Sequence, residues 1–329
     1  MRILVTGGSG FIASHLIDHL VTNYPQYHVV NFDKLDVCSS THNNQTVQHA
    51  ANYKFVKGDI TSSDLLTHLL SSERIDTIIH AAAQSHVDAS FGNSLTFTHN
   101  NVYGTHVLLE AAKNSNIRRF IHVSTDEVYG SCDENCKTEL CATNPTNPYA
   151  ASKAAAESIV RGYMNSFKFP AIITRGNNVY GQRQYVEKLI PKFIMRLFDN
   201  KKCCIHGDGS NRRHYLHVLD TVAAFDIILH KGIVGETYNI GSVDEFTNIQ
   251  IAEKLVRLIK NDDVKSWIEF VPDRAFNDSR YYLTFKKLSH LGWSPKHSFD
   301  DSLSDVIEWY KNIDMTSYWS IQANLALNP

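Results

Sequence analysis

The sequence lacks several features that would assign it to a whole class of proteins. No apolar run approaches the length of a transmembrane helix, so we expect no membrane partner. The 32 Lys and Arg residues nearly balance the 34 Asp and Glu residues, and a net charge of −2 gives no field that attracts nucleic acid. Residues 1–6 lead directly into an expected strand rather than into the apolar segment of a secretory signal. We therefore expect a cytoplasmic protein.

Metal-binding cysteine patterns are also missing. The six cysteines are Cys38, Cys132, Cys136, Cys141, Cys203 and Cys204, and no two of them are separated by two residues. The cluster at 132–141 fits no zinc spacing, so we expect no metal site. Reduced thiols are the default for a cytosolic protein.

The 43% of hydrophobic and 20% of charged residues are ordinary for a globular chain, and 329 residues suffice for one large or two modest domains.

The first 33 residues have the pattern of a dinucleotide-binding unit. An apolar strand at 2–6 precedes the glycine turn 7–13, a helical apolar pattern and a second strand that ends at Asp33. Such a turn places backbone N–H groups and a helix dipole against a pyrophosphate. An acid at the position of Asp33 binds ribose hydroxyls and favours NAD over NADP, although an ordinary aspartate at the end of a strand is the alternative.

Strands and helices continue to alternate after this unit. Strands are expected at 55–56, 77–80, 120–123 and 171–175, and helices at 63–70, 101–112 and 150–167. Beyond them we expect a loop at 177–181, helices at 187–198, 218–229 and 247–259, and strands at 203–205 and 237–240. The pattern predicts an α/β fold with a doubly wound parallel sheet, Rossmann-like and NAD-binding, and a smaller, discontinuous C-terminal substrate domain. We assign 1–175 to the first domain, with 215–240 returning to it, and 176–214 and 241–329 to the second.

The most informative stretch follows the strand at 120–123. Ser124-Thr125-Asp126-Glu127 stands where parallel sheets place their chemistry, and Tyr149 and Lys153 share one face of the next helix. Lys153 favours the tyrosinate, and moving the pKa of a phenol from about 10 to about 7 requires roughly 4 kcal/mol, which a lysine and a positive cofactor ring together can supply. The adjacent acids exceed what a simple hydride transfer needs. Taken separately, the Tyr/Lys pair could be a solvated helix face, and the Asp-Glu pair could be a helix cap or a loop charge.

Two arginine-bearing segments complete the pattern. Residues 212–214 follow a glycine turn, and residues 273–280 form a second basic, polar loop. Arginine suits a diphosphate, so we expect both segments to surround a nucleotide substrate. His86 is either a ligand or base, or a histidine held by structural hydrogen bonds.

These motifs resemble the extended short-chain dehydrogenase/reductase enzymes, and within them the nucleotide-sugar 4,6-dehydratases. The resemblance runs from Arg2 to about Trp309 and includes the cofactor loop at 6–12, the signature 124–130 and the substrate loops 187–191 and 207–211. The segments 33–36, 174–180 and 276–278 are most similar to the dehydratase half of plant-type UDP-rhamnose synthases. Ala13 replaces a glycine that many members carry, and Gln182 replaces a proline that relatives usually carry.

The resemblance implies a lyase that converts UDP-glucose to UDP-4-keto-6-deoxy-glucose and water with tightly bound NAD. It implies catalytic roles for Thr125, Asp126, Glu127, Tyr149 and Lys153. Expected cofactor-binding residues are Gly7, Gly10, Phe11, Ile12, Asp33, Lys34, Asp59, Ile60, Ala81, Ala83, Ser85, Tyr149, Lys153 and Asn178. Expected substrate-binding residues are Ser85, Thr125, Asn178, Glu187, Lys188, Leu189, Arg213, Asn239 and Arg274.

Several alternatives remain open at this point. The nucleotide is uridine or thymidine, as in the bacterial dTDP-glucose enzymes. A nucleotide-sugar 4-epimerase shares the fold and the Tyr/Lys pair but has no need of the two acids, and a non-catalytic NAD-binding sensor usually loses the tyrosine or the lysine. The family implies a homodimer through helices 101–112 and 150–167, and a separate downstream epimerase and reductase.

Overall fold

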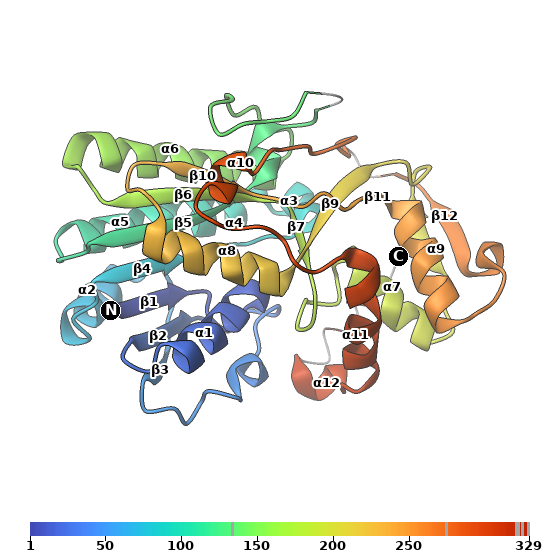
Figure 1. Cartoon of the computed structure of the whole chain (residues 1–329), viewed down its shortest axis with the longest axis horizontal. Coiled ribbons are helices and arrows are strands. Elements are labelled where there is room, and N and C mark those ends of the chain that lie inside the picture. The colour runs from blue at the N-terminus through green and yellow to red at the C-terminus, as the bar shows by residue number, and fades with distance from the viewer. Residues whose placement is uncertain (133–134, 274–275, 320–322, 324–325, 328–329) are drawn as a thin grey trace.

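Seven parallel strands form the central sheet of the computed structural model, which describes residues 1–132, 135–273, 276–319, 323 and 326–327. Their order across the sheet is β10-β6-β5-β4-β1-β2-β3 (Figure 1). The bounds are β1 (Arg2–Thr6), β2 (His28–Asp33), β3 (Tyr53–Lys57), β4 (Thr77–His80), β5 (Arg119–Thr125), β6 (Ala171–Gly176) and β10 (Thr237–Ile240). The strand order reverses direction between β1 and β4, as in doubly wound dinucleotide-binding folds. The predicted fold class is confirmed.

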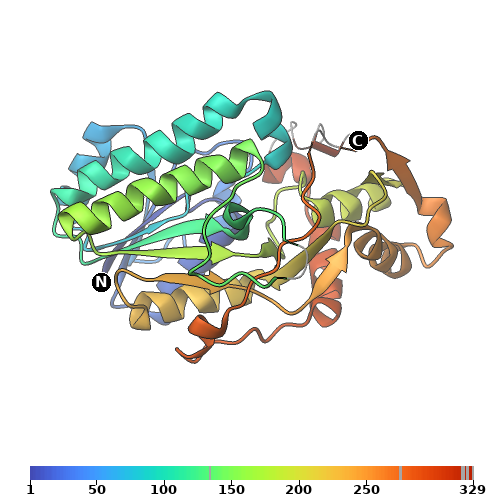
Figure 2. The same cartoon turned by 90° about the horizontal axis from the view of Figure 1, so that it is seen from above.

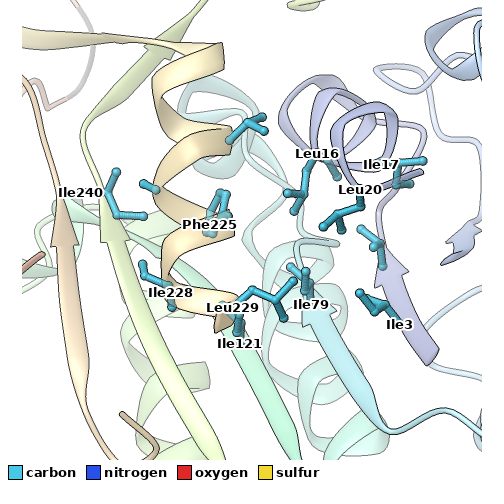
Figure 3. Close-up of a cluster of buried hydrophobic side chains, with 14 of the residues drawn as sticks. Ile3, Leu16, Ile17, Leu20, Ile79, Ile121, Phe225, Ile228, Leu229 and Ile240 are labelled. Atoms are coloured by element: carbon cyan, nitrogen blue, oxygen red, sulfur yellow. The ribbon is translucent and has the colours of Figure 1, made fainter. Parts of the chain in front are cut away.

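Helices cover both faces of this sheet (Figures 1 and 2). One face carries α1 (Phe11–Asn23) and α8 (Val218–Lys231), and the other carries α2 (Ser63–Ser72), α5 (Gly104–Lys113) and α6 (Pro148–Phe167). Since side chains alternate along a strand, Ile3 packs under α1 and α8 while Leu4 packs on the opposite face. Figure 3 shows Leu20 of α1 and Phe225 of α8 directed at the first of these cores.

A second group of elements follows β6 and has its own apolar core. A small sheet joins β7 (Asn178–Tyr180), β9 (Arg212–His217) and β11 (Glu245–Thr247), and β8 (Cys203–His206) pairs with β12 (Ile268–Val271). Helices α7 (Leu189–Phe198), α9 (Asn248–Ile259) and α11 (Phe299–Lys311) enclose a buried cluster that includes Ile194, Leu255 and Leu303.

Short elements complete the chain. They are η1 (Thr41–Asn44), α3 (Val87–Gly92), α4 (Ser94–Phe97), η2 (Thr98–Tyr103), η3 (Asp126–Tyr129), η4 (Val264–Trp267), α10 (Lys286–Ser289) and α12 (Met315–Tyr318). Within the described ranges, none of the helices combines the length and the apolarity needed to cross a membrane.

Two local predictions were wrong. The expected loop 177–181 contains strand β7, because its backbone pairs with β9 at Asn178 and Tyr215. The helix expected from residue 101 is preceded by a π-helix at 98–103 and by two short helices. Both differences depend on pairing partners or irregular helical turns that local periodicity does not encode.

Candidate active site

A cavity of about 340 Å³ lies where the strands of the central sheet end. Its walls come from the glycine turn after β1, the end of β2, the alanines after β4, the end of β5 and the start of α6. Residues from β7 and from the segment before α7 close the opposite side. A cavity at the point where the strand order reverses is the usual ligand site of a doubly wound sheet.

The glycine turn leaves room for a phosphate group. Gly7 has φ +69°, and a Cβ placed on it would lie 2.8 Å from the backbone of Ala82. A side chain at Gly7 is therefore excluded by both conformation and space. Helix α1 follows the N-cap residue Gly10, which makes no side-chain cap hydrogen bond, and residues 10–13 line the cavity. The free N–H groups at the start of a helix suit a pyrophosphate.

Asp33 organises the turn in addition to lining the cavity. Its Oδ2 accepts a hydrogen bond from the backbone N–H of Ser9 at 3.0 Å, and its Oδ1 accepts from Leu35 N at 2.7 Å and Ser39 Oγ at 3.1 Å. Burial raises the pKa of this carboxyl, and the three donors oppose that rise. An acid at this position, at the end of the second strand, can accept hydrogen bonds from the hydroxyls of a ribose.

All but one of the predicted cofactor residues line the cavity. Those that do are Gly7, Gly10, Phe11, Ile12, Asp33, Lys34, Ile60, Ala81, Ala83, Ser85, Tyr149, Lys153 and Asn178. Asp59 is not part of the wall. Its Oδ2 lies 3.7 Å from the ammonium of Lys34, which does line the cavity.

Tyr149 and Lys153 lie one turn apart on α6, and both line the cavity. Lys153 donates from Nζ to the carbonyl oxygen of Val123 at 2.6 Å. Burial and the negative charge of Glu127 raise the pKa of Tyr149, and a hydrogen bond with Thr125 opposes that rise. The predicted lowering of this pKa rests on Lys153 together with a positive cofactor ring, so it stays a prediction. Tyrosinate formation requires further positive charge in the cavity.

The two acids are buried and held by specific donors. Asn177 donates from Nδ2 to Asp126 Oδ2 at 2.7 Å, and Asn147 donates to Glu127 Oε2 at 3.1 Å. Burial raises the pKa of Asp126 to about 7, with the charge of Glu127 adding to the effect. Burial also raises the pKa of Glu127. Glu127 lines the cavity, whereas Asp126 is buried and is not one of the lining residues. A carboxylic acid and a base of this kind are what an elimination requires.

Four of the predicted substrate residues, namely Ser85, Thr125, Asn178 and Lys188, line the same cavity. Lys188 donates from Nζ to the carbonyl oxygen of Ser85 at 2.7 Å, which ties the segment before α7 to the main sheet. Glu187 lies outside the wall, and its Oε1 is 2.8 Å from Nδ1 of buried His86. His86 therefore has a carboxylate partner and also lines the cavity.

The remaining predicted substrate residues lie elsewhere. Asn239 is fully buried, does not line the cavity, and bonds Tyr129 Oη and two backbone carbonyls. Leu189 packs against the core of the second group of elements. The guanidinium of Arg213 lies 4.4 Å from the ring centre of Tyr281, and its charge acts on both acids. Arg274 lies outside the described residues.

Sequence reasoning missed the residues that orient the acids. Asn177 holds Asp126, and Tyr281 places its hydroxyl 3.4 Å from Glu127 Oε2. Asn147 has a recognisable signal, because Asn before Pro148 is a typical helix start and its Oδ1 caps the backbone N–H of Ala150. Across the ranges that the structure describes, no group of three His, Cys, Asp or Glu side chains is placed to hold a metal ion.

Comparison with known proteins places this site in a family context. The chain is 53% identical over 313 residues to a trifunctional UDP-glucose 4,6-dehydratase/3,5-epimerase/reductase of Arabidopsis thaliana, covering 94% of this chain and 47% of that protein. It is 49% identical to a dTDP-D-glucose 4,6-dehydratase of Mus musculus, covering 94% of this chain and 88% of the other. The chain thus spans about half the length of the Arabidopsis relatives that it matches.

Solved structures have the same fold. A dTDP-glucose 4,6-dehydratase of Streptomyces venezuelae with NAD bound superposes with a TM-score of 0.93 at 38% identity, covering 98% of this chain and 100% of that one. A UDP-glucuronic acid 4-epimerase of Bacillus cereus superposes with a TM-score of 0.88 at 30% identity, covering 94% and 99%. Dehydratases and epimerases share the architecture, so side chains and not the fold separate their reactions. Residues 4–306 match the model of the GDP-mannose 4,6 dehydratase family, and the chain belongs to that family.

Proposed function

We propose that this protein is an NAD-dependent nucleotide-sugar 4,6-dehydratase that converts UDP-glucose to UDP-4-keto-6-deoxy-glucose and water. The observation that carries the proposal is the buried pair Asp126 and Glu127, held by Asn177 and Asn147 beside the Tyr149 and Lys153 of one cavity. Oxidation alone needs a single base, whereas removal of water also needs a base at carbon and an acid at the departing oxygen.

The cavity fits NAD. The glycine turn accommodates the pyrophosphate, Asp33 faces the ribose position, and the alanines after β4 allow close approach of the cofactor. When bound, NAD accepts a hydride from the sugar and later returns it, so the cofactor is regenerated in each cycle. Lys153 would hold the nicotinamide ribose, and the positive ring adds to the charge that favours the tyrosinate.

Each catalytic side chain has a proposed task. Tyr149 takes the proton of the C4 hydroxyl while Thr125 hydrogen-bonds the C4 oxygen. Once C4 is a ketone, the C5 proton becomes acidic and Glu127 removes it. Asp126 donates a proton to the C6 hydroxyl, which leaves as water. The hydride taken from C4 would return to C6, and C5 would regain a proton, which completes the 4-keto-6-deoxy product. A pKa of about 7 keeps a substantial fraction of Asp126 protonated near neutral pH, as this task requires.

The thymidine nucleotide is the second candidate. A mouse dTDP-D-glucose 4,6-dehydratase matches at 49% identity over 88% of its length, which is close to the 53% of the Arabidopsis relative. The segments that resemble plant-type enzymes favour uridine.

The two parts of the chain have separate proposed tasks. Residues 1–175 with 215–240 are proposed to bind the cofactor, and residues 176–214 with 241–329 are proposed to bind the nucleotide sugar.

Mass spectrometry of the products tests this proposal. The purified protein is incubated with UDP-glucose and, separately, with dTDP-glucose, and each product is compared with its substrate. We expect each product to be lighter than its substrate by one water, and we expect UDP-glucose to be dehydrated faster than dTDP-glucose. Faster dehydration of dTDP-glucose would reverse the nucleotide assignment. A product of unchanged mass whose proton NMR spectrum shows inversion at C4 would identify an epimerase. No turnover of either sugar would favour an NAD-binding sensor.

A homodimer through the helices of one sheet face is also proposed. Leu95 of α4, Tyr103 of η2 and Phe167 of α6 are exposed there, Leu95 to 80% of its surface. Burial of such apolar side chains against a second copy would stabilise a dimer. Light scattering after gel filtration measures the mass, and a Leu95→Glu variant is expected to shift it toward the monomer. The keto product would pass to an epimerase and a reductase outside these 329 residues.

A further inference from the structure

Asp278 is a buried carboxyl that the proposed reaction does not use. It is 3% exposed and does not line the cavity. Its backbone is held from strand β9 and from the turn before it. Arg213 donates from Nη1 to the carbonyl oxygen of Asp278 at 3.0 Å, and Asn211 donates from Nδ2 to the same oxygen at 3.1 Å. A carboxyl at this depth is costly unless hydrogen-bond donors satisfy its side chain.

Two hydroxyl groups donate to the side chain of Asp278. Thr146 Oγ1 lies 2.8 Å from Oδ1 and 2.8 Å from Oδ2. Tyr281 Oη lies 2.5 Å from Oδ2, and this tyrosine is itself buried. Thr146 precedes the start of helix α6, whereas Asp278 and Tyr281 belong to the segment after β12. The carboxyl therefore joins the loop that leads to Tyr149 to the second group of elements.

Tyr281 has a second carboxyl neighbour. Its Oη also lies 3.4 Å from Oε2 of Glu127, the proposed base of the elimination. A tyrosine hydroxyl carries a single hydrogen, so it can donate fully to only one of the two carboxyls. Hydrogen bonds between two oxygens span about 2.5–3.0 Å. The two distances therefore assign this hydrogen to Asp278 and direct a lone pair of the tyrosine oxygen toward Glu127.

Glu127 is left with few hydrogen-bond donors. Apart from Tyr281, Asn147 is the only donor to its carboxyl within the described ranges, at 3.1 Å from Oε2. Burial raises the pKa of Glu127, and the charge of Asp278 adds to that rise. Each further donor to the carboxylate would favour its charged form and weaken it as a base. The other charged or titratable groups around Glu127 are Asp126, Tyr149, Lys188 and Arg213.

We propose that Asp278 is a positioning residue of the reaction: it holds the hydroxyl hydrogen of Tyr281 away from Glu127 and so keeps Glu127 a strong base. Without Asp278, rotation of the hydroxyl about its C–O bond would direct the hydrogen to Glu127. The carboxylate would then take a proton from carbon less readily. The effect on elimination rests on the proposed function, because Glu127 has a proton to remove only if the sugar loses water. The place of the hydrogen does not rest on it.

The protonation of Glu127 is followed by NMR. Protein labelled with ¹³C-glutamate and carrying the cofactor with which it purifies is titrated with acid, and the Glu127 signal is identified by its absence from Glu127→Gln. The test variant is Asp278→Asn, which keeps the shape of the side chain but offers Tyr281 a neutral acceptor. Tyr281→Phe and the double variant complete a double-mutant cycle. Asp220→Asn removes a similarly buried carboxyl from α8 and is the matched control.

Asp278→Asn should lower the pKa of Glu127 by roughly one unit, because the hydroxyl hydrogen moves to Glu127 and a nearby negative charge is lost. Tyr281→Phe should leave this pKa nearly unchanged, since the wild-type hydroxyl donates to Asp278. In the Tyr281→Phe background, Asp278→Asn should have a smaller effect than in the wild type, because only the loss of charge remains. Asp220→Asn should not change the pKa of Glu127.

Three outcomes of the titrations would overturn the inference. A clear rise of the Glu127 pKa in Tyr281→Phe would show that the wild-type hydroxyl donates to Glu127. An effect of Asp278→Asn that is equally large in both backgrounds would show that charge alone links the two carboxyls. An unchanged pKa in Asp278→Asn would show no link at all.

Single-turnover kinetics connect the titration to the reaction. Asp278→Asn should form bound NADH at the normal rate and consume it up to about tenfold more slowly, the limit for a base weakened by one pKa unit. Slower formation with normal consumption would contradict a role in elimination. Absence of turnover in the wild type would instead refute the proposed function, and the NMR titration would still decide where the hydrogen of Tyr281 lies.

Discussion

Asp126 should make the stability of this protein depend on pH in a way that one substitution removes. The carboxyl is 3% exposed and its Oδ2 accepts from Asn177, so Asp126→Asn keeps the shape and an acceptor for that donor. Burial raises its pKa to about 7 from 3.8. A rise of this size means that the folded protein favours the protonated form by roughly 4 kcal/mol, an upper bound for a group in such a site.

The sign of the effect follows from proton linkage. Because the folded protein binds this proton more tightly than the unfolded chain, the stabilisation is fully present below the unfolded pKa and is lost as pH rises to about 7. The wild type should therefore lose stability relative to Asp126→Asn between about pH 4 and pH 7, by up to about 4 kcal/mol. The amide that this substitution introduces carries no charge at any pH in this range.

Urea unfolding of both proteins at pH 4.5, 6.0 and 7.5 measures this difference. The free-energy gap between variant and wild type should change steadily in favour of the variant as pH rises. Asp300→Asn, at a side chain that is 65% exposed, is the control and should run parallel to the wild type. If the unfolding free energy of Asp126→Asn also changes with pH in parallel with that of the wild type, Asp126 ionises in the folded protein without a loss of stability. The assignment of Asp126 as the acid of the elimination would then lose its physical basis.

Three further results are expected. Tyr149→Phe should form no NADH in stopped-flow single turnover, whereas Glu127→Gln should still oxidise C4 and accumulate bound NADH, because general base assistance is worth about 10²–10⁴-fold; normal product formation by Glu127→Gln would remove that residue from the elimination. NADP should bind more weakly than NAD in calorimetry of the apo-protein, since its 2′-phosphate would meet Asp33, and equal affinities would refute this. Arg213→Ala should raise KM roughly 10- to 150-fold with a smaller change in kcat, from the loss of a charge-assisted contact of about 1.5–3 kcal/mol; an unchanged KM would place the diphosphate elsewhere.

Local sequence determined the elements whose physical cause is local. The glycine turn needs φ values and space that only glycine supplies at Gly7, so its pattern is visible without any structure. The spacing of Tyr149 and Lys153 places both on one helical face wherever that helix lies. Runs of apolar residues with two-residue or helical periodicity were sufficient to predict the seven strands of the sheet and most of the helices around them.

Tertiary structure alone decided how these pieces act on each other. Asn177 reaches Asp126 across 51 positions, and Glu187 pairs with His86 rather than facing the cavity. Asn239, in a polar sequence context, became a buried structural residue. Burial and the charge of Glu127 raise the pKa of Tyr149, and neither effect can be derived from the spacing of Tyr149 and Lys153 in the sequence. Burial and the distances between charges set such properties, and both arise only when strands and loops far apart in the chain are packed together.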